Sequence, residues 1–496
     1  MKKLLTIILD GFGMREDIYG NAVKNAGMTN FINIWNKYPH CLLKASGAPV
    51  NLPKDQCGFS EYGHKLIGCG RKIRSRLSIA DDAFYKGTIN NSKKIKEMIE
   101  HLKMTNKNIH LITIASDGGV VSHIEHLISM IRYLESNDIH NIILDIITDG
   151  VDSNSYSSYK YIRYIEEQYP YIKISTICGR YYASDVTGDY NRTKNYYELL
   201  INGKGVSTPS IQRIIDLCYE RKLNDNYLPP IRTNDFTPID DNDVLFFMTF
   251  GNEAKQLIEA LTDDQFDKFL TEKVKLKIYT LFNINGVKSN NILSEAKEDD
   301  TLCEYLGELG LSQARVAESL KEESIIYYMD GSRNIDIPDC DNYIVTSHKV
   351  DTFDKKPEMN SLAVAKAVIN CMEKDYDFII ANFANPDIIG HTGNYQATIN
   401  GLQAIDVCLE NIIEAAEDNF YKIIIVGSHA KADTIIDRDN NIITQNTLSS
   451  VPFIIMDKNV KLYNGDLTMV APTILKYLEI TPPKKMKKTK TLFDEE

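Results

Sequence analysis

The sequence lacks the features that mark several large classes of protein. Its nine cysteines include no Cys-x-x-Cys pair and no framework spacing, so reduced thiols are favoured over disulfides. The apolar run at residues 4–9 follows two lysines but ends at Asp10, which makes it too short for a secretory signal or a membrane span. We therefore expect a cytoplasmic protein that does not associate with a membrane.

Concentrated positive charge is also missing. The net charge is −12, and the dense basic run at residues 484–488 lies near the end of the chain, where a solvated tail is expected. This balance argues against binding to nucleic acid or to acidic membranes. We expect a monomer without a nucleic-acid partner.

Three short apolar runs, typical of buried strands, are followed by side chains that can bind metals. The runs and these side chains are 4–9 with Asp10, 378–383 with Asp387 and His391, and 421–426 with Ser428 and His429. Open parallel sheets bind ligands at the carboxyl ends of their strands, so the three groups are expected at one edge. On a helix, the four-residue spacing of Asp387 and His391 would suit a divalent metal. The alternatives are a capping aspartate, a loop histidine and, at Asp10, a turn residue.

A polar stretch bounded by glycines contains the candidate nucleophile. Ser60 lies between Gly58 and Gly63 and could be presented at the start of a helix. There its hydroxyl would face backbone N–H groups that favour a phosphate. The alternative is an ordinary N-cap serine.

A second series of strand and loop units begins near residue 76, and the first pattern resumes after about residue 297 with a helix over 301–309. The series has predicted strands at 109–115, 141–147, 172–178 and 244–250, with helices at 124–134 and 193–201. A chain of 496 residues usually forms more than one domain. We predict an α/β protein with two doubly wound domains: residues 1–75 and 297–496 form a discontinuous domain, and residues 76–296 form an inserted one.

Several stretches carry a specific resemblance to a known family. They are residues 8–13, 58–64, 116–120, 122–124, 179–183, 356–359 and 382–391. In this order they resemble motifs of the cofactor-independent phosphoglycerate mutases of the alkaline-phosphatase superfamily, and the likeness runs nearly end to end. The resemblance implies a phosphatase-like domain with two manganese ions and a serine nucleophile. It also implies an inserted transferase domain that binds phosphoglycerate, a small phosphorylated metabolite.

The resemblance assigns roles to individual residues. Ser60 would be the phosphorylated nucleophile. Ser60 would be held on one metal with Asp10 and His429, and Asp387 and His391 would hold the other; Ser428 and Asn446 stand at two further metal positions. Paired metals that activate a hydroxyl and bind both attacking and leaving oxygens suit phosphoryl transfer. The substrate-contacting positions would be His123, Asp152, Arg180 and Lys321, with Asp152 as the base that handles the proton of the glycerate hydroxyl.

The chain departs from the family in both halves of this site. Ser428 stands where the family has a metal-binding aspartate, and Asn446 where it has its last metal histidine. Both are neutral, so at least one metal site is expected to be weak. Four family arginines are replaced, by Val151, Val186, Gly251 and Ala254. Bidentate guanidinium contacts to anions contribute about 1.5–3 kcal/mol each, so most of the affinity for phosphoglycerate should be lost.

Three functions remain open. The first is metal-dependent phosphoryl transfer through Ser60, with impaired activity on phosphoglycerate or an altered substrate. The second is an ordinary glycolytic phosphoglycerate mutase. The third is a catalytically silent paralogue that binds a ligand or a partner protein.

Overall fold

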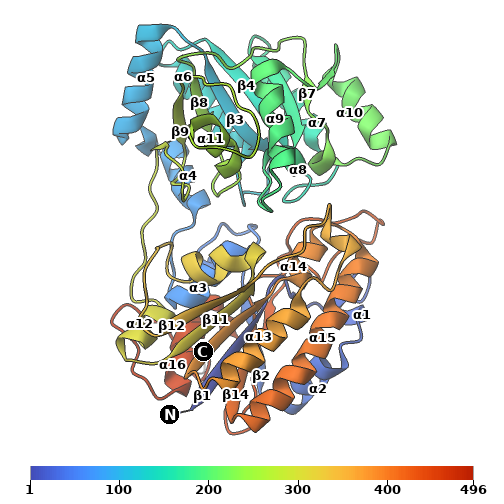
Figure 1. Ribbon diagram of the computed structural model, residues 1–496, viewed down its shortest axis with the longest axis vertical. Helices are drawn as coiled ribbons and strands as arrows, with labels where there is room; N and C mark the ends of the chain where they lie inside the picture. The colour runs from blue at the N-terminus through green and yellow to red at the C-terminus, as the bar shows by residue number, and fades with distance from the viewer. Residues whose placement is uncertain (1, 495–496) are drawn as a thin grey trace. The chain divides into compact units, whose positions relative to one another are not determined.

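The computed structural model describes residues 2–494 and divides into two compact units (Figure 1). The terminal unit comprises the chain up to Arg74 and from Ala296 onward, and the inserted unit comprises Ser75–Glu295. Each unit is built on one eight-stranded sheet with helices packed against it. The predicted α/β fold class is therefore confirmed.

The sheet of the terminal unit is mostly parallel. Among its described strands, only β15 pairs antiparallel with its neighbours. The strand order is β12 (Cys340–Val345), β11 (Gln313–Glu318), β13 (Phe378–Phe383), β1 (Lys3–Leu9), β14 (Tyr421–Gly427), β15 (Val451–Ile455), β2 (His40–Lys44) and β16 (Gly465–Asp466).

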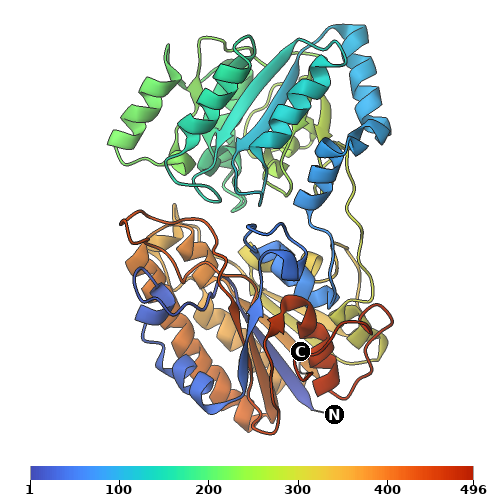
Figure 2. The same ribbon diagram turned by 180° about the vertical axis from the view of Figure 1, so that it is seen from behind.

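Helices cover both faces of this sheet, which explains why its central strands are apolar at nearly every position. Leu5 and Ile7 of β1 pack in one cluster and Leu4 and Ile8 in another, because successive side chains point to opposite faces. The first face is covered by α1 (Ala22–Asn25), α2 (Thr29–Lys37), α13 (Ser361–Glu373) and α15 (Tyr395–Asp418). The opposite face, seen from behind in Figure 2, is covered by α3 (Ser60–Cys69), α12 (Leu302–Glu308) and α16 (Val470–Tyr477).

The three strands expected to carry site residues are neighbours. β1 pairs in parallel with both β13 and β14, and Leu9 lies opposite Phe383 on one side and Gly427 on the other. The three strands therefore end at the same level of the sheet. Asp10 and Ser428 follow directly, and α14 (Asn385–Gly390) begins two residues after β13.

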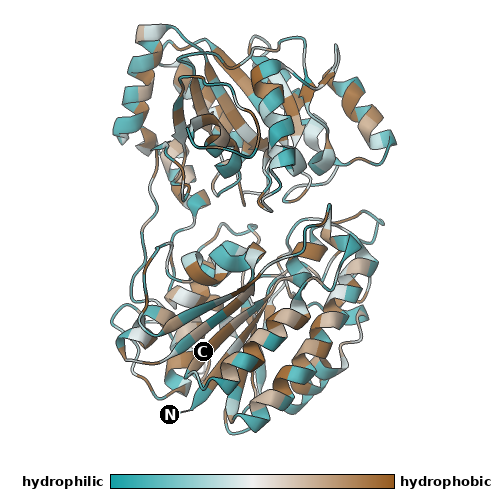
Figure 3. Ribbon diagram, in the orientation of Figure 1, coloured by the Kyte–Doolittle hydropathy of each residue, from teal (hydrophilic) through white to brown (hydrophobic). Residues whose placement is uncertain are grey.

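The inserted unit repeats this design. Its strand order is β10 (Asn290–Asn291), β9 (Lys277–Thr280), β8 (Val244–Phe247), β3 (Ile109–Ala115), β4 (Ile142–Thr148), β5 (Lys173–Gly179), β7 (Ile231–Arg232) and β6 (Val206–Ser207). Apolar residues dominate its central strands, as Figure 3 shows. Its helices are α4 (Arg76–Tyr85), α5 (Lys93–Thr105), α6 (Ile124–Glu135), α7 (Ser158–Gln168), α8 (Arg180–Ala183), α9 (Tyr190–Asn202), α10 (Ile211–Glu220) and α11 (Lys255–Thr262).

The predicted strand over 244–250 is wrong at its end. The strand stops at Phe247, because the chain then turns into a loop in which the Phe250 N–H donates to the carbonyl of Val121. No helix formed by residues 2–494 is both long enough and apolar enough to cross a membrane.

A buried ion pair holds the segment that follows β11. Arg315 donates two hydrogen bonds of 2.8 Å to the carboxylate of Asp330, and both side chains are buried. Removing one partner of such a pair leaves an uncompensated buried charge. We expect Arg315→Met to lower the free energy of unfolding of the terminal unit by about 3–5 kcal/mol in chemical denaturation.

The matched control is Arg438→Met. The Arg438 side chain is 83% exposed and pairs with Asp17, so its loss should change stability by less than about 1 kcal/mol. Equal destabilisation by the two variants would contradict this account of Arg315.

Candidate functional site

Ser60 and Asp10 form the first contact of the site. Asp10 follows β1 and is fully buried. Ser60 is the first residue of α3, so its predicted place at a helix start is confirmed. The Ser60 hydroxyl donates a hydrogen bond to Asp10 Oδ2 over 2.7 Å. A carboxylate in this position can accept the proton that a serine loses when it acts as a nucleophile.

The ammonium of Lys321 links this serine to two carboxylates. Lys321 ends the short helix η4 (Ser319–Lys321), which follows β11. Its Nζ lies 3.0 Å from Ser60 Oγ, 2.8 Å from Asp10 Oδ2 and 2.5 Å from Asp387 Oδ2. Burial opposes ionisation of both aspartates, but the ammonium holds the pKa of each carboxyl well below its usual value. Lys321, expected among substrate contacts, therefore contacts the candidate nucleophile and two candidate metal ligands.

Asp387 lies beside two histidines. It lies in α14, and His391, four residues later, is the C-cap of this helix. The Oδ1 of Asp387 lies 3.2 Å from His391 Nε2 and 2.9 Å from His429 Nε2. One ligand atom from each of the three residues lies within 4.8 Å of the others. A carboxylate oxygen with two imidazole nitrogens is a donor set that could hold a divalent transition metal.

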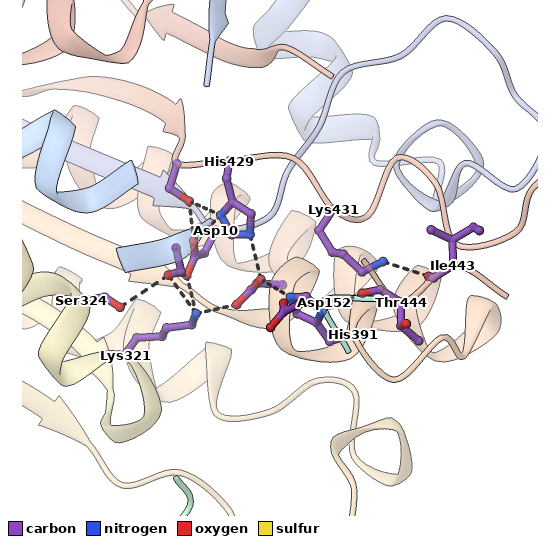
Figure 4. A network of polar contacts seen from close by, with 12 residues as sticks. Asp10, Asp152, Lys321, Ser324, His391, His429, Lys431, Ile443 and Thr444 are labelled. Atoms are coloured by element: carbon purple, nitrogen blue, oxygen red, sulfur yellow. Dashed lines mark hydrogen bonds and ion pairs between the residues drawn. The ribbon is translucent and has the colours of Figure 1, made fainter. Parts of the chain in front are cut away.

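His429 connects the two aspartates (Figure 4). Its Nδ1 lies 3.2 Å from Asp10 Oδ1, while its Nε2 faces Asp387. Burial alone would lower the pKa of this imidazole, but the carboxylates of Asp387 and Asp10 raise it to about 9. Ser428 also donates a hydrogen bond to Asp10 Oδ1. The four residues expected around one metal, including Ser60, thus lie together and are joined by hydrogen bonds.

Asn446 and Lys431 are two more buried residues of the terminal unit. Asn446 is 8% exposed, and its side-chain oxygen has no hydrogen-bond partner in the described part of the chain. It lies two residues beyond Thr444, whose carbonyl accepts a 2.7 Å hydrogen bond from His391 Nδ1. Lys431 donates to the neighbouring carbonyl of Ile443, and burial lowers its pKa to about 8. Sequence reasoning missed Lys431, because no local pattern indicates that a lysine is buried.

A second polar cluster lies at the carboxyl ends of strands in the inserted unit. Arg180 Nη1 lies 2.7 Å from Asp149 Oδ1 and 2.6 Å from Asp152 Oδ2. Ser116 donates to Asp149 Oδ2 over 2.6 Å. Burial opposes ionisation of Asp149, but Arg180 lowers the pKa of this carboxyl. Sequence reasoning paired Asp152 with Arg180 but missed Asp149, which follows β4 directly and could have been found by its place at a strand end.

His123 and the positions of the four replaced arginines complete the predicted substrate side. His123 is the N-cap of α6, and its Nδ1 accepts a hydrogen bond of 3.3 Å from the N–H of Glu125. Burial lowers the pKa of this imidazole. Val186 is 66% exposed, whereas Ala254 is buried. None of the four replacements supplies a positive charge.

The Arg180 ion pair generates a prediction with a pH dependence. Arg180→Met leaves the Asp149 carboxylate buried without its cation. The free energy of unfolding of the inserted unit should therefore fall by about 3 kcal/mol at neutral pH. The pKa of Asp149 is depressed in the folded state, so the stabilisation is present above its unfolded value, near 3.9, and is lost as the pH falls below it. Urea unfolding should therefore separate the two proteins at pH 7, and the separation should shrink as the pH falls below about 3.9.

Lys160→Met is the control in the same unit. Lys160 pairs with Asp117 at the surface, over 3.4 Å, and its removal should cost less than about 1 kcal/mol. A difference between wild type and Arg180→Met that persists undiminished in acid would contradict the ion-pair account.

A family model and two sequence relatives each match nearly the whole chain. The family model of the metalloenzyme superfamily matches residues 2–482. The 2,3-bisphosphoglycerate-independent phosphoglycerate mutase of Gracilaria tenuistipitata var. liui is 35% identical over 504 residues, covering 98% of this chain and 97% of its own. The protein of the same name from Mycoplasma genitalium is 34% identical, covering 98% of each chain.

The fold is also shared with a solved structure. Leishmania mexicana phosphoglycerate mutase, crystallised at low cobalt concentration, superposes with a TM-score of 0.93 at 24% identity, covering 99% of this chain and 97% of its own. This likeness shows the fold, and the sequence relatives show the family. The chain belongs to the metalloenzyme superfamily and, within it, to the family of 2,3-bisphosphoglycerate-independent phosphoglycerate mutases.

Proposed function

We propose that this chain transfers phosphoryl groups through a phosphoserine at Ser60, assisted by a divalent cation, and that it acts poorly on 3- and 2-phosphoglycerate. The observation that carries the proposal is the pair of contacts at Ser60 Oγ. The Asp10 carboxylate accepts its proton and the Lys321 ammonium lies beside its oxygen. A nucleophilic serine needs both a base and a nearby positive charge.

The phosphoryl group moves first to Ser60. Ser60 Oγ attacks the phosphorus of a phosphomonoester, and its proton passes to Asp10. The bond between Oγ and phosphorus forms while the bond from phosphorus to the ester oxygen breaks, and that oxygen takes up the proton that Asp10 releases and leaves as an alcohol. Lys321 stabilises the negative charge that develops on Oγ. A hydroxyl group then attacks the phosphorus held on Ser60, the bond from phosphorus to Oγ breaks, and Oγ takes up the proton that this hydroxyl releases. In the inserted unit, Asp152 is the residue that the resemblance assigns as the base for a glycerate hydroxyl.

One divalent cation fits the residues of the terminal unit. Asp387, His391 and His429 supply one oxygen and two nitrogens within 4.8 Å of one another. The unpaired oxygen of Asn446 is a candidate fourth donor, because buried acceptors usually have a partner. When bound, such an ion polarises a phosphoryl oxygen. We propose manganese, which accepts mixed oxygen and nitrogen ligands.

The inserted unit supports a substrate that is less anionic than phosphoglycerate. Its retained Arg180 already contacts two aspartates through one nitrogen. The four positions at which relatives of the resembled family carry arginine are here valine, valine, glycine and alanine. A phosphoglycerate carries a carboxylate as well as a phosphate, and each lost guanidinium contact weakens binding by about 1.5–3 kcal/mol. A phosphomonoester without a carboxylate would depend on fewer of these guanidinium contacts, so its binding would be weakened less.

A silent binding protein is the second candidate function. It is favoured by the same Lys321 contacts, since an ammonium held on both aspartates could serve structure alone.

The test is covalent labelling: after incubation with Mn²⁺ and a phosphomonoester such as glycerol 3-phosphate, intact mass spectrometry should detect one added phosphoryl group. Ser60→Ala should abolish it. Ser361→Ala, which removes a buried serine hydroxyl at the start of α13, should not. An unlabelled wild-type protein would favour the silent alternative.

Activity on phosphoglycerate separates this proposal from an ordinary glycolytic mutase. In an enolase-coupled assay with excess Mn²⁺, we expect conversion of 3-phosphoglycerate below about 1 s⁻¹, under the usual range for enzymes. Turnover in the usual enzyme range, abolished by Ser60→Ala, would instead support the hypothesis of an ordinary glycolytic mutase.

Returning a single arginine should recover part of the lost binding. Val186 is exposed at a position where the resembled family has arginine, so Val186→Arg can be accommodated without repacking. We expect the KM for 3-phosphoglycerate to fall by roughly 10-fold or more, which corresponds to about 1.5 kcal/mol. Val206→Arg is the control, because Val206 is 41% exposed in the same unit and lies on β6, whereas Val186 lies in the loop between α8 and α9. An equal effect of both variants would indicate non-specific attraction of the anion.

A further inference from the structure

We infer that Ser324 is a further catalytic residue for phosphoryl transfer in the terminal unit. Its hydroxyl donates a hydrogen bond to Ser60 Oγ before the reaction, and to an oxygen of the phosphoryl group while Ser60 carries that group. This role rests on the proposed function, because it concerns the same serine. The hydrogen bonds of Ser60, the helix that bears Ser324 and the burial of both hydroxyls support it.

The hydrogen bonds at Ser60 show which of the two hydroxyls is the donor. A serine hydroxyl has one O–H donor and two acceptor lone pairs. Ser60 donates its proton to Asp10 Oδ2 over 2.7 Å, and Ser324 Oγ lies 3.5 Å from Ser60 Oγ (Figure 4). Because Ser60 has no second proton to donate, Ser324 is the donor in this contact.

Both acceptor lone pairs of Ser60 Oγ therefore have a donor. The Lys321 ammonium, 3.0 Å away, contacts one of them, and the Ser324 hydroxyl contacts the other. Attack on phosphorus needs a free lone pair, so one of these two contacts must be exchanged when the new bond forms. The Ser324 contact is the longer of the two and comes from a neutral group, which makes it the weaker one. We expect it to be the contact that is exchanged.

A phosphoryl group on Ser60 offers the Ser324 hydroxyl a new acceptor. Once phosphorus is bonded to Oγ, its other oxygens come within reach of Ser324, whose hydroxyl can rotate and donate to one of them. The O–H bond of Ser324 stays intact throughout. Within the described residues, Ser60 Oγ is the single hydrogen-bond partner of this hydroxyl, so no other contact is lost. A donor in this position stabilises the negative charge of the phosphoryl oxygens.

Two packed helices hold Ser324 against Ser60. Ser324 begins η5 (Ser324–Tyr328), a short π-helix, and Ser60 begins α3, which lies against η5. A Cβ on Gly68 of α3 would lie 2.0 Å from the carbonyl oxygen of Met329, which follows η5. Glycine at this position therefore allows the close packing that brings the two serines together. Turns of π-helix are rare and frequently occur at functional sites.

Burial strengthens the hydrogen bond that Ser324 can give. Ser60 and Ser324 are each 5% exposed, so water competes little for either hydroxyl. A hydrogen bond to a charged group is stronger in such a place than in water. Ser324 is neutral, so it can support the phosphoryl group without changing the net charge beside Asp10 and Lys321.

The test is the rate at which Ser60 is phosphorylated. Full-length protein is incubated with Mn²⁺ and saturating glycerol 3-phosphate, and intact mass spectrometry follows the added phosphoryl group over time. We expect Ser324→Ala to lower the rate constant by roughly 10-fold or more, because it removes a donor to a charged group. Circular dichroism checks that each variant is folded.

Two further variants separate the hydroxyl from the shape of the side chain. Ser324→Thr keeps the hydroxyl and should recover most of the wild-type rate. Ser324→Cys has nearly the shape of serine but only a weak S–H donor, so it should be slow like Ser324→Ala. A Ser324→Cys protein that is phosphorylated as fast as the wild type would contradict the role of the hydroxyl.

Ser361→Ala is the matched control. Ser361 is 2% exposed, and its hydroxyl donates to the carbonyl of Glu358, so its loss should leave the rate of phosphorylation unchanged. Folded Ser324→Ala that is phosphorylated at the wild-type rate, or equal slowing by Ser361→Ala, would overturn the inference alone. Absence of the phosphoryl group from the wild type would overturn the proposed function, and the role of Ser324 with it.

Discussion

The contact of the Lys321 ammonium with Asp10 and Asp387 is the interaction on which the site of the terminal unit depends. Both carboxylates are buried and stay ionised, although removing a charge from water costs several kcal/mol. The ammonium offsets this cost, and it also contacts Ser60. The same residue therefore allows the two strand ends to carry acids and polarises the serine that lies between them.

The sheet supplies the geometry that this interaction needs. β13, β1 and β14 are parallel neighbours that end at one level, so residues hundreds of positions apart in the sequence meet at one edge of the sheet. Helix α3 then approaches the end of β14 so closely that a Cβ on Gly63 would lie 2.2 Å from the carbonyl oxygen of Ser428. Glycine at this position lets Ser60 reach the edge where Asp10 lies.

The inserted unit shares the fold of a solved phosphoglycerate mutase, and the proposed change of substrate concerns its charged side chains. Arg180 is held by Asp149 and Asp152, and the positions of four other family arginines are uncharged. The fold of a catalytic domain does not by itself fix its substrate. Recognition of an anion depends on a few guanidinium groups, so we propose that the uncharged residues at these positions alter the preferred substrate while the packed strands beneath keep the fold.

The sequence by itself determined the fold class, the family and most members of the site. Short apolar runs that precede Asp10 and Asp387 are sufficient to predict these acids at one edge, because ligands of open parallel sheets bind at the carboxyl ends of the strands. Only the tertiary structure decided which polar side chains contact one another in the site. The position of Lys321, the direction of the Ser428 hydrogen bond and the burial of Lys431 depend on contacts between distant segments. A local sequence pattern predicts the element on which a side chain lies. Which atoms that side chain contacts depends on the segments packed around it.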